Sequence, residues 1–115
     1  MEYKEIFRLK EMLNKANIPF EYKNRGWELP YYYRLTIEFH QIGYPNLNLN
    51  ERVCSVVEGD GTFGADADRL EIMGLLTDEE YEDSCVLGGL TAEEVFERIS
   101  KHYKGILSKG VIYGK

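Results

Sequence analysis

The chain has 115 residues, which is enough for one domain with one hydrophobic core. Hydrophobic residues make up 43% of the chain and aromatic residues 13%, a composition that excludes intrinsic disorder. Two cysteines are too few for a disulfide scaffold or a cysteine metal site. The sequence contains no apolar run of the ~18–20 residues that span a bilayer, and its charged start, MEYKEIFRLK, is unlike a signal peptide. We therefore expect a globular protein of a reducing, cytosolic compartment.

Charge is divided unevenly along the chain. The stretch 58–97 holds 13 of the 20 acidic residues and one of the 14 basic residues, so its net charge is −12 and that of the remaining chain is +6. Acidic character of this density repels nucleic acid and attracts basic protein surfaces. We therefore expect a partner with a basic protein surface, with neither direct nucleic-acid binding nor a membrane partner.

The first half of the chain predicts one helix followed by strands. Apolar side chains at helical spacing predict an N-terminal helix that ends before Pro19; they are Ile6, Leu9, Leu13 and Ala16. Alternating side chains predict a short strand over 18–22 and a clear strand over 31–40, followed by a hairpin loop over 43–50. A third strand is predicted over 52–57, and its two apolar faces indicate a strand that is either central in the sheet or covered on both faces.

The second half predicts helices. The spacing of Leu70, Met73 and Leu76 predicts a helix after the loop 59–64. Two Thr-x-x-Glu capping boxes, at 77–80 and 91–94, each predict a helix start, and the second helix carries an apolar stripe. The stretch 105–113 suits a last strand or a docked tail. Together the elements predict a single α+β domain over residues 1–115, with about three antiparallel strands, an N-terminal helix and two to three C-terminal helices packed on the sheet.

The loop 59–64 matches the pattern G-x-G-x-x-G between a predicted strand and a predicted helix. In that setting glycines let backbone N–H groups approach a phosphate, and the helix N-terminus adds partial positive charge. Carboxylates crowd the loop, and the chain lacks the repeated strand–helix units of a dinucleotide fold. A plain strand-to-helix turn is therefore our main interpretation. The alternative is that the protein binds or sequesters a nucleotide or another small phosphate-containing ligand through Gly59, Gly61, Thr62, Gly64 and Arg69.

The residues that carry chemistry form no recognisable catalytic or metal-binding set. His40 and His102 are far apart in the sequence, and we interpret His40 as a satisfied surface histidine. Cys54 and Cys85 have apolar neighbours and are interpreted as buried and inert. We therefore expect a protein that is not an enzyme, with no catalytic residues, no metal and no cofactor.

Two features suit a protein interface. The run 30–33, Pro-Tyr-Tyr-Tyr, offers rigid aromatic contact area, although its rings could equally cover apolar surface at a strand entry or form a homodimer contact. The acidic segment 78–83 is by default a solvated helix face, and its functional interpretation is an anionic surface that docks on a basic groove. The candidate partner-binding residues are Asp78, Glu79, Glu80, Glu82, Asp83, Tyr31 and Tyr32.

Three stretches together resemble small uncharacterised proteins encoded by phages and prophages of Firmicutes-type bacteria: 53–64 (VCSVVEGDGTFG), 70–77 (LEIMGLLT) and 90–99 (LTAEEVFERI). The likeness covers roughly residues 53–100. It implies an accessory function in the cytoplasm of a bacterial host. Many inhibitors of host defence, anti-CRISPR proteins among them, are small, acidic, non-enzymatic binders. We therefore expect a binding protein that inhibits or modulates a host defence or nucleic-acid-handling protein through an acidic surface.

Overall fold

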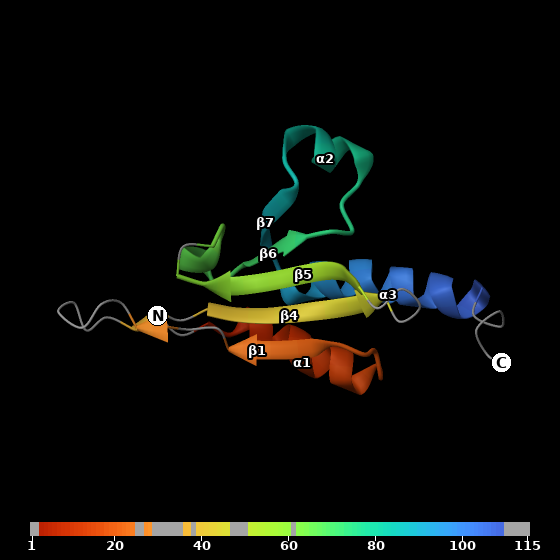
Figure 1. The fold of residues 1–115 in the computed structure, drawn as a ribbon, viewed down its shortest axis with the longest axis horizontal. Helices are drawn as coiled ribbons and strands as arrows, with labels where there is room; N and C mark the ends of the chain where they lie inside the picture. The colour runs from red at the N-terminus through yellow and green to blue at the C-terminus, as the bar shows by residue number, and fades with distance from the viewer. Residues whose placement is uncertain are drawn as a thin grey trace.

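The computed structural model describes residues 3–24, 27–28, 36–37, 39–46, 51–60 and 62–109. They form an α+β fold built on a five-stranded antiparallel sheet in the order β1-β4-β5-β6-β7 (Figure 1). The strands of this sheet are β1 (Glu21–Asn24), β4 (Phe39–Asn46), β5 (Glu51–Gly59), β6 (Leu70–Met73) and β7 (Val86–Leu90). The helices are α1 (Glu5–Lys15), α2 (Asp78–Asp83) and α3 (Ala92–Lys109), with a 3-10 turn over Ala65–Ala67. In addition, β2 (Trp27–Glu28) pairs with β3 (Thr36–Ile37).

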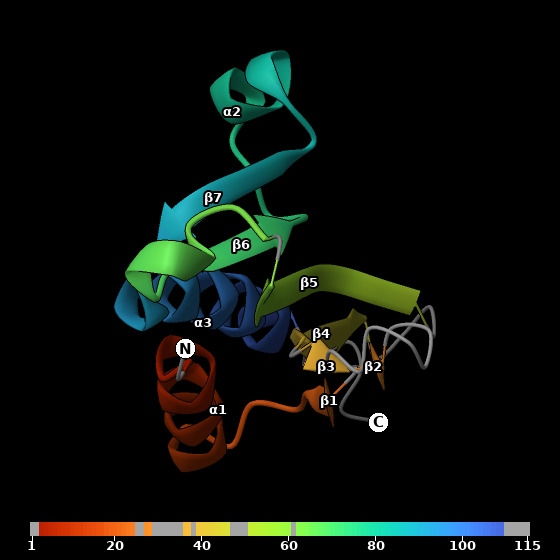
Figure 2. The ribbon, with the colours of Figure 1, turned by 90° about the vertical axis from the view of Figure 1, so that its left-hand side faces the viewer.

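The helices divide into two that cover the sheet and one that does not. α1 packs against α3, β4 and β5, and α3 packs against β6, so both lie on the same face of the sheet (Figure 2). α2 lies in the long connection between β6 and β7 and projects away from the sheet (Figure 1). No helix in the described part of the chain is long and apolar enough to cross a membrane.

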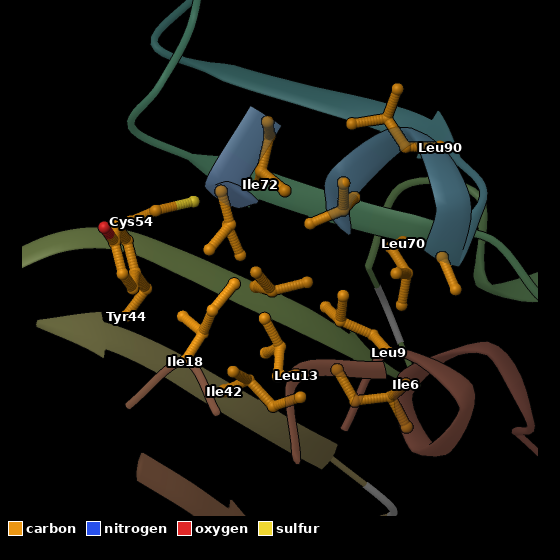
Figure 3. Close-up of a cluster of buried hydrophobic side chains, with 14 residues drawn as sticks. Ile6, Leu9, Leu13, Ile18, Ile42, Tyr44, Cys54, Leu70, Ile72 and Leu90 are labelled. Carbon is orange, nitrogen blue, oxygen red and sulfur yellow. The ribbon is translucent and has the colours of Figure 1, made fainter. Parts of the chain in front are cut away.

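The hydrophobic core lies between the two covering helices and the sheet (Figure 3). Helical spacing buries Ile6, Leu9 and Leu13 on α1, as predicted, whereas Ala16 follows the end of the helix and is exposed. The predicted stripe of α3 is also buried or half-buried: Ala92, Val95, Phe96, Ile99 and Tyr103.

Of the two alternatives for the third strand, the structure shows the central position, because β5 lies between β4 and β6. Its side chains alternate, so Cys54 and Val56 are buried towards the helices, while Val53 and Val57 line a groove on the opposite face. One face of β5 therefore belongs to the core, and the other lines the groove.

The prediction of a helix over Leu70, Met73 and Leu76 is wrong, because this stretch begins with β6. Leu70 and Ile72 are buried and Met73 is exposed, which is the alternation of a strand that pairs with both β5 and β7. Gly74 then adopts φ +98° and ends the strand. In a run of four residues the spacing of apolar side chains cannot distinguish the period of a helix from that of a strand. Hydrogen bonding to β5 and β7 makes this segment a strand. The estimate of about three strands was accordingly too low.

Other boundaries also differ from the prediction. The stretch 105–113 is not a strand over its described part, because α3 continues through Gly105 to Lys109. The first predicted strand begins at Glu21, and the predicted loop 43–50 is occupied by β4 as far as Asn46. Of the predicted strand 31–40, residues 31–35 and 38 lie outside the described residues, as do 47–50 of the loop.

Candidate functional site

The acidic segment forms a short projecting arm. We call residues 77–83, which comprise Thr77 and α2, the acidic arm. Its predicted capping box is present: Thr77 Oγ1 accepts from Glu80 N–H at 3.2 Å, and the Glu80 carboxylate accepts from Thr77 N–H at 2.8 Å. The arm also carries four exposed carboxylates, those of Asp78, Glu79, Glu82 and Asp83. The candidate residues Tyr31 and Tyr32 lie outside the described residues.

The remaining arm carboxylate, that of Glu80, attaches the arm to α3. Both terminal nitrogens of Arg98 donate to Glu80, at 2.7 and 2.6 Å, and Arg98 Nη1 also donates to the Leu75 carbonyl at 2.9 Å. The Arg98 guanidinium lowers the pKa of Glu80 to about 2, with help from the Thr77 N–H. Glu80 therefore positions the arm, and the other four acids of α2 are exposed to solvent.

This attachment gives a direct prediction. Arg98→Met should release α2, because a charged hydrogen bond contributes about 1.5–3 kcal/mol and the variant loses all three that Arg98 donates, two to Glu80 and one to the Leu75 carbonyl. Amide hydrogen exchange within 78–83 should accelerate at least about tenfold, while exchange in β5 stays unchanged. Arg8→Met is the matched control, since Arg8 pairs with Glu93 far from the arm. Equal exchange rates in the wild-type protein and the Arg98 variant would show that other contacts hold the arm.

Beside the arm, the face of the sheet opposite the helices is hollowed into a groove of about 750 Å³. We call this hollow the open groove. Its apolar lining comes from β4, β5, β6 and α2, and consists of Phe39, Val53, Val57, Met73 and Tyr81. Met73 is 53% exposed and Tyr81 is 50% exposed, so two large side chains meet solvent at its arm end. A hollow of this volume is in the range that accommodates a bound molecule or a partner side chain.

Polar groups of the open groove are mostly paired within the chain. Gln41 Nε2 donates to Ser55 Oγ at 2.7 Å. The Arg52 side chain crosses β4 so closely that a Cβ at Gly43 would lie 2.6 Å from Arg52 Nε, and its guanidinium lies 3.8 Å from the Glu21 carboxylate. A side chain at position 43 would therefore have to displace the Arg52 side chain.

The glycine loop 59–64 uses its backbone donors internally. Gly59 N–H donates to Thr62 Oγ1 at 3.1 Å, and Thr62 N–H donates to the Gly59 carbonyl at 3.1 Å. Phe63 N–H donates to the Glu71 carboxylate at 2.8 Å, and Arg69 donates to backbone carbonyls. The expected helix after the loop is only the 3-10 turn, and Gly61 lies outside the described residues. Among its described residues, the loop therefore offers little of what a phosphate site needs.

Packing also explains one glycine of this loop. Gly64 adopts φ +93°, and a Cβ there would lie 2.9 Å from Gly89 N. Only glycine satisfies both conditions without strain. The main sequence interpretation, a plain strand-to-helix turn, is correct in that the loop is a turn, but a 3-10 turn and then the strand β6 follow it, not a helix.

The carboxyls at the beginnings of α1 and α3, of which those of Glu5 and Glu58 are buried, are a feature that sequence reasoning missed. Asp68 accepts from the N–H groups of Lys4 and Glu5 at 2.9 and 3.1 Å, and Glu58 accepts from Ile6 N–H at 3.0 Å. Glu5 in turn accepts from Ala92 N–H at 2.6 Å, at the first residue of α3. Carboxylates distant in sequence thus satisfy the helix N-termini and their partial positive charge.

Glu58 is fully buried, and burial, together with the neighbouring Asp68, raises its pKa to about 8. Burial alone would raise the pKa of Asp68 as well, but hydrogen bonds from Glu58 and from two backbone amides lower it overall. Within the described part of the chain, Glu58 Oε2 accepts no hydrogen bond, so a proton there can be donated to Asp68. Strand alternation from Cys54 and Val56 was the signal for this burial, because Glu58 is next on the same face.

Two predictions about the histidines and cysteines are wrong, those for His40 and Cys85. His40 is buried, not at the surface, and its Nδ1 lies 2.9 Å from Tyr22 Oη beneath the ring of Phe7. Cys54 is buried as predicted, and burial raises its pKa to about 12. Cys85, however, is exposed because it follows the projecting arm. Among the residues whose placement is described, no three His, Cys, Asp or Glu side chains are arranged to hold a metal ion.

Compared with protein-family models, curated protein sequences and solved structures, the chain gives no match. The features on which a function can be argued are therefore the acidic arm, the open groove and the buried carboxyls.

Proposed function

We propose that this protein is a non-enzymatic binding protein whose acidic arm docks on a basic protein surface. The observation that carries the proposal is the composition and placement of α2. Five of its six residues are acidic and none is basic, and four of those acids are exposed on an element that projects from the fold (Figure 1). Such a concentrated negative charge attracts a basic surface and accelerates encounter with it.

The attachment of the arm supports binding rather than simple solvation of a helix face. Thr77 and Arg98 hold α2 through the capping box and the two-point ion pair described above. An element that is ordered before binding loses less conformational entropy on association. Tyr81, half exposed among the acids, adds a rigid side chain of the kind that contributes strongly at protein interfaces.

The kind of partner follows from the same charge and from the likeness to phage proteins. A nucleic-acid-handling protein carries lysine- and arginine-rich grooves that bind phosphates, and an acidic arm can occupy such a groove. The phage likeness favours a host defence protein of this kind. The proposed activity is therefore inhibition or modulation of that partner by contact.

Charge replacement on the arm tests this function. The partner is first isolated by co-purification from a bacterial host with the tagged protein, and its affinity is then measured with purified components. Glu79→Gln with Glu82→Gln should weaken binding about tenfold at low salt and reduce its salt dependence, because two exposed charges are removed while Thr77, Glu80 and Arg98 stay intact.

The matched control is Glu11→Gln with Glu97→Gln, which removes two exposed acids from α1 and α3. This variant should bind nearly as well as the wild-type protein. Equal losses in the two double variants would mean that net charge, not the arm, governs binding, and the proposal would then fail.

A further inference from the structure

We infer that the open groove receives an apolar side chain of the same partner, so that the bound segment carries an apolar anchor flanked by lysine or arginine. This inference rests on the proposed function and specifies the chemistry of its partner. The arm and the open groove are continuous, because Tyr81 of α2 is part of the groove lining. A segment attracted by the arm would therefore reach the groove directly.

The lining of the open groove suits an apolar anchor. Phe39, Val53 and Val57 provide apolar surface from two adjacent strands, and Met73 is more than half exposed at the arm end. Covering such surface is favourable by about 25 cal/mol per Å² removed from water. Methionine adapts its shape readily, which suits a contact with varied side chains.

The polar groups of the groove do not oppose this occupant. Gln41 and Ser55 hydrogen-bond to each other at 2.7 Å, so a covering apolar side chain leaves that hydrogen bond intact. Glu71 likewise accepts from Phe63 N–H at 2.8 Å. An anchor can therefore be buried here without leaving either of these pairs unsatisfied.

The charge around the groove selects a basic segment. Arg52 is the cation among the described residues that line it, and Glu21 lies 3.8 Å from Arg52 Nη2. Glu71 lies within the groove, and the exposed acids of the arm adjoin it at Tyr81. Lysine or arginine on both sides of the anchor would face this negative rim, whereas an acidic segment would be repelled.

Two synthetic peptides labelled with fluorescein test the inference by fluorescence anisotropy. The first has a central Leu-Phe pair flanked on both sides by lysines, and the second has two serines in place of Leu-Phe. We expect the first peptide to bind about tenfold more tightly than the second. Met73→Gln should remove most of that advantage without changing the affinity for the serine peptide, because it alters only the apolar contact.

Leu107→Gln is the matched control, since Leu107 is a similarly exposed apolar side chain on α3, outside the groove. Equal affinities for the two peptides, or equal effects of the Met73 and Leu107 variants, would overturn the groove inference. The Glu79→Gln, Glu82→Gln variant separates this failure from that of the proposed function. If it weakens binding of both peptides, the acidic arm remains supported, and if it weakens neither, the proposed function fails as well.

Discussion

Replacing Glu58 with glutamine should stabilise the folded protein near pH 8 and remove much of its pH dependence of stability. Glutamine has the shape of a protonated glutamate. Its carbonyl can accept from Ile6 N–H, and its amide can donate to Asp68, as a protonated Glu58 carboxyl would. The variant therefore keeps both contacts and can no longer lose the proton.

The sign of the pH dependence follows from the pKa of Glu58, which is about 8 in the folded chain against an ordinary value of 4.5. Between pH 4.5 and about 8 the folded chain holds a proton that the unfolded chain has released. The free energy of unfolding therefore falls as the pH rises through this range. One such group contributes at most about 1.4 kcal/mol per pH unit. The stabilisation from protonated Glu58 is fully present below pH 4.5, the pKa in the unfolded chain. It is lost as the pH rises through about 8, the pKa in the folded chain.

Urea unfolding of the wild-type protein and the Glu58→Gln variant, at several pH values from about 5 to 8, measures this effect. Burial lowers the pKa of His102, which has the opposite effect on stability at low pH, but His102 titrates in both proteins. The difference between the two curves therefore isolates Glu58. A constant difference at every pH would mean that Glu58 is ionised in the folded state.

Replacing Gly74 with alanine should destabilise the protein by more than about 2 kcal/mol. Gly74 adopts φ +98°, which is unfavourable for any residue with a side chain, and a Cβ there would lie 2.2 Å from the Val53 carbonyl oxygen. The obstacle is backbone of the central strand, so it cannot move aside as a flexible side chain could. Gly74 also precedes the arm and lines the open groove, so both should be distorted in the same variant.

Gly105→Ala is the matched control for this substitution. Gly105 lies within α3, and a Cβ there has open space around it. Alanine should raise the free energy of unfolding by up to about 1 kcal/mol, because it favours a helix over glycine. Thermal unfolding of the two variants should therefore shift in opposite directions. A mild effect of Gly74→Ala would show that β5 and β6 can separate locally at little cost.

The elements that sequence patterns predicted well have local signals. The spacing of Ile6, Leu9 and Leu13 is typical of a helix whatever it packs against, and each capping box closes hydrogen bonds between residues three positions apart. The sequence also showed that the arm is acidic. It did not predict that the arm projects from the fold, because a run of acids has the same composition on a covered helix and on an exposed arm.

The sequence by itself therefore determined the α+β class, the two helix starts marked by capping boxes, the existence of the strand β5 and the acidic segment. Only the tertiary structure decided that 70–73 is a strand, that the described part of the sheet has an open groove, and that Asp68 and the Ile6 N–H lie beside the Glu58 carboxyl. Capping and helical spacing act within a few residues, whereas Glu58 meets Ile6 across 52 positions of the chain and Arg98 meets Glu80 across 18. The pKa of a carboxyl depends on such distant neighbours, which no local pattern contains.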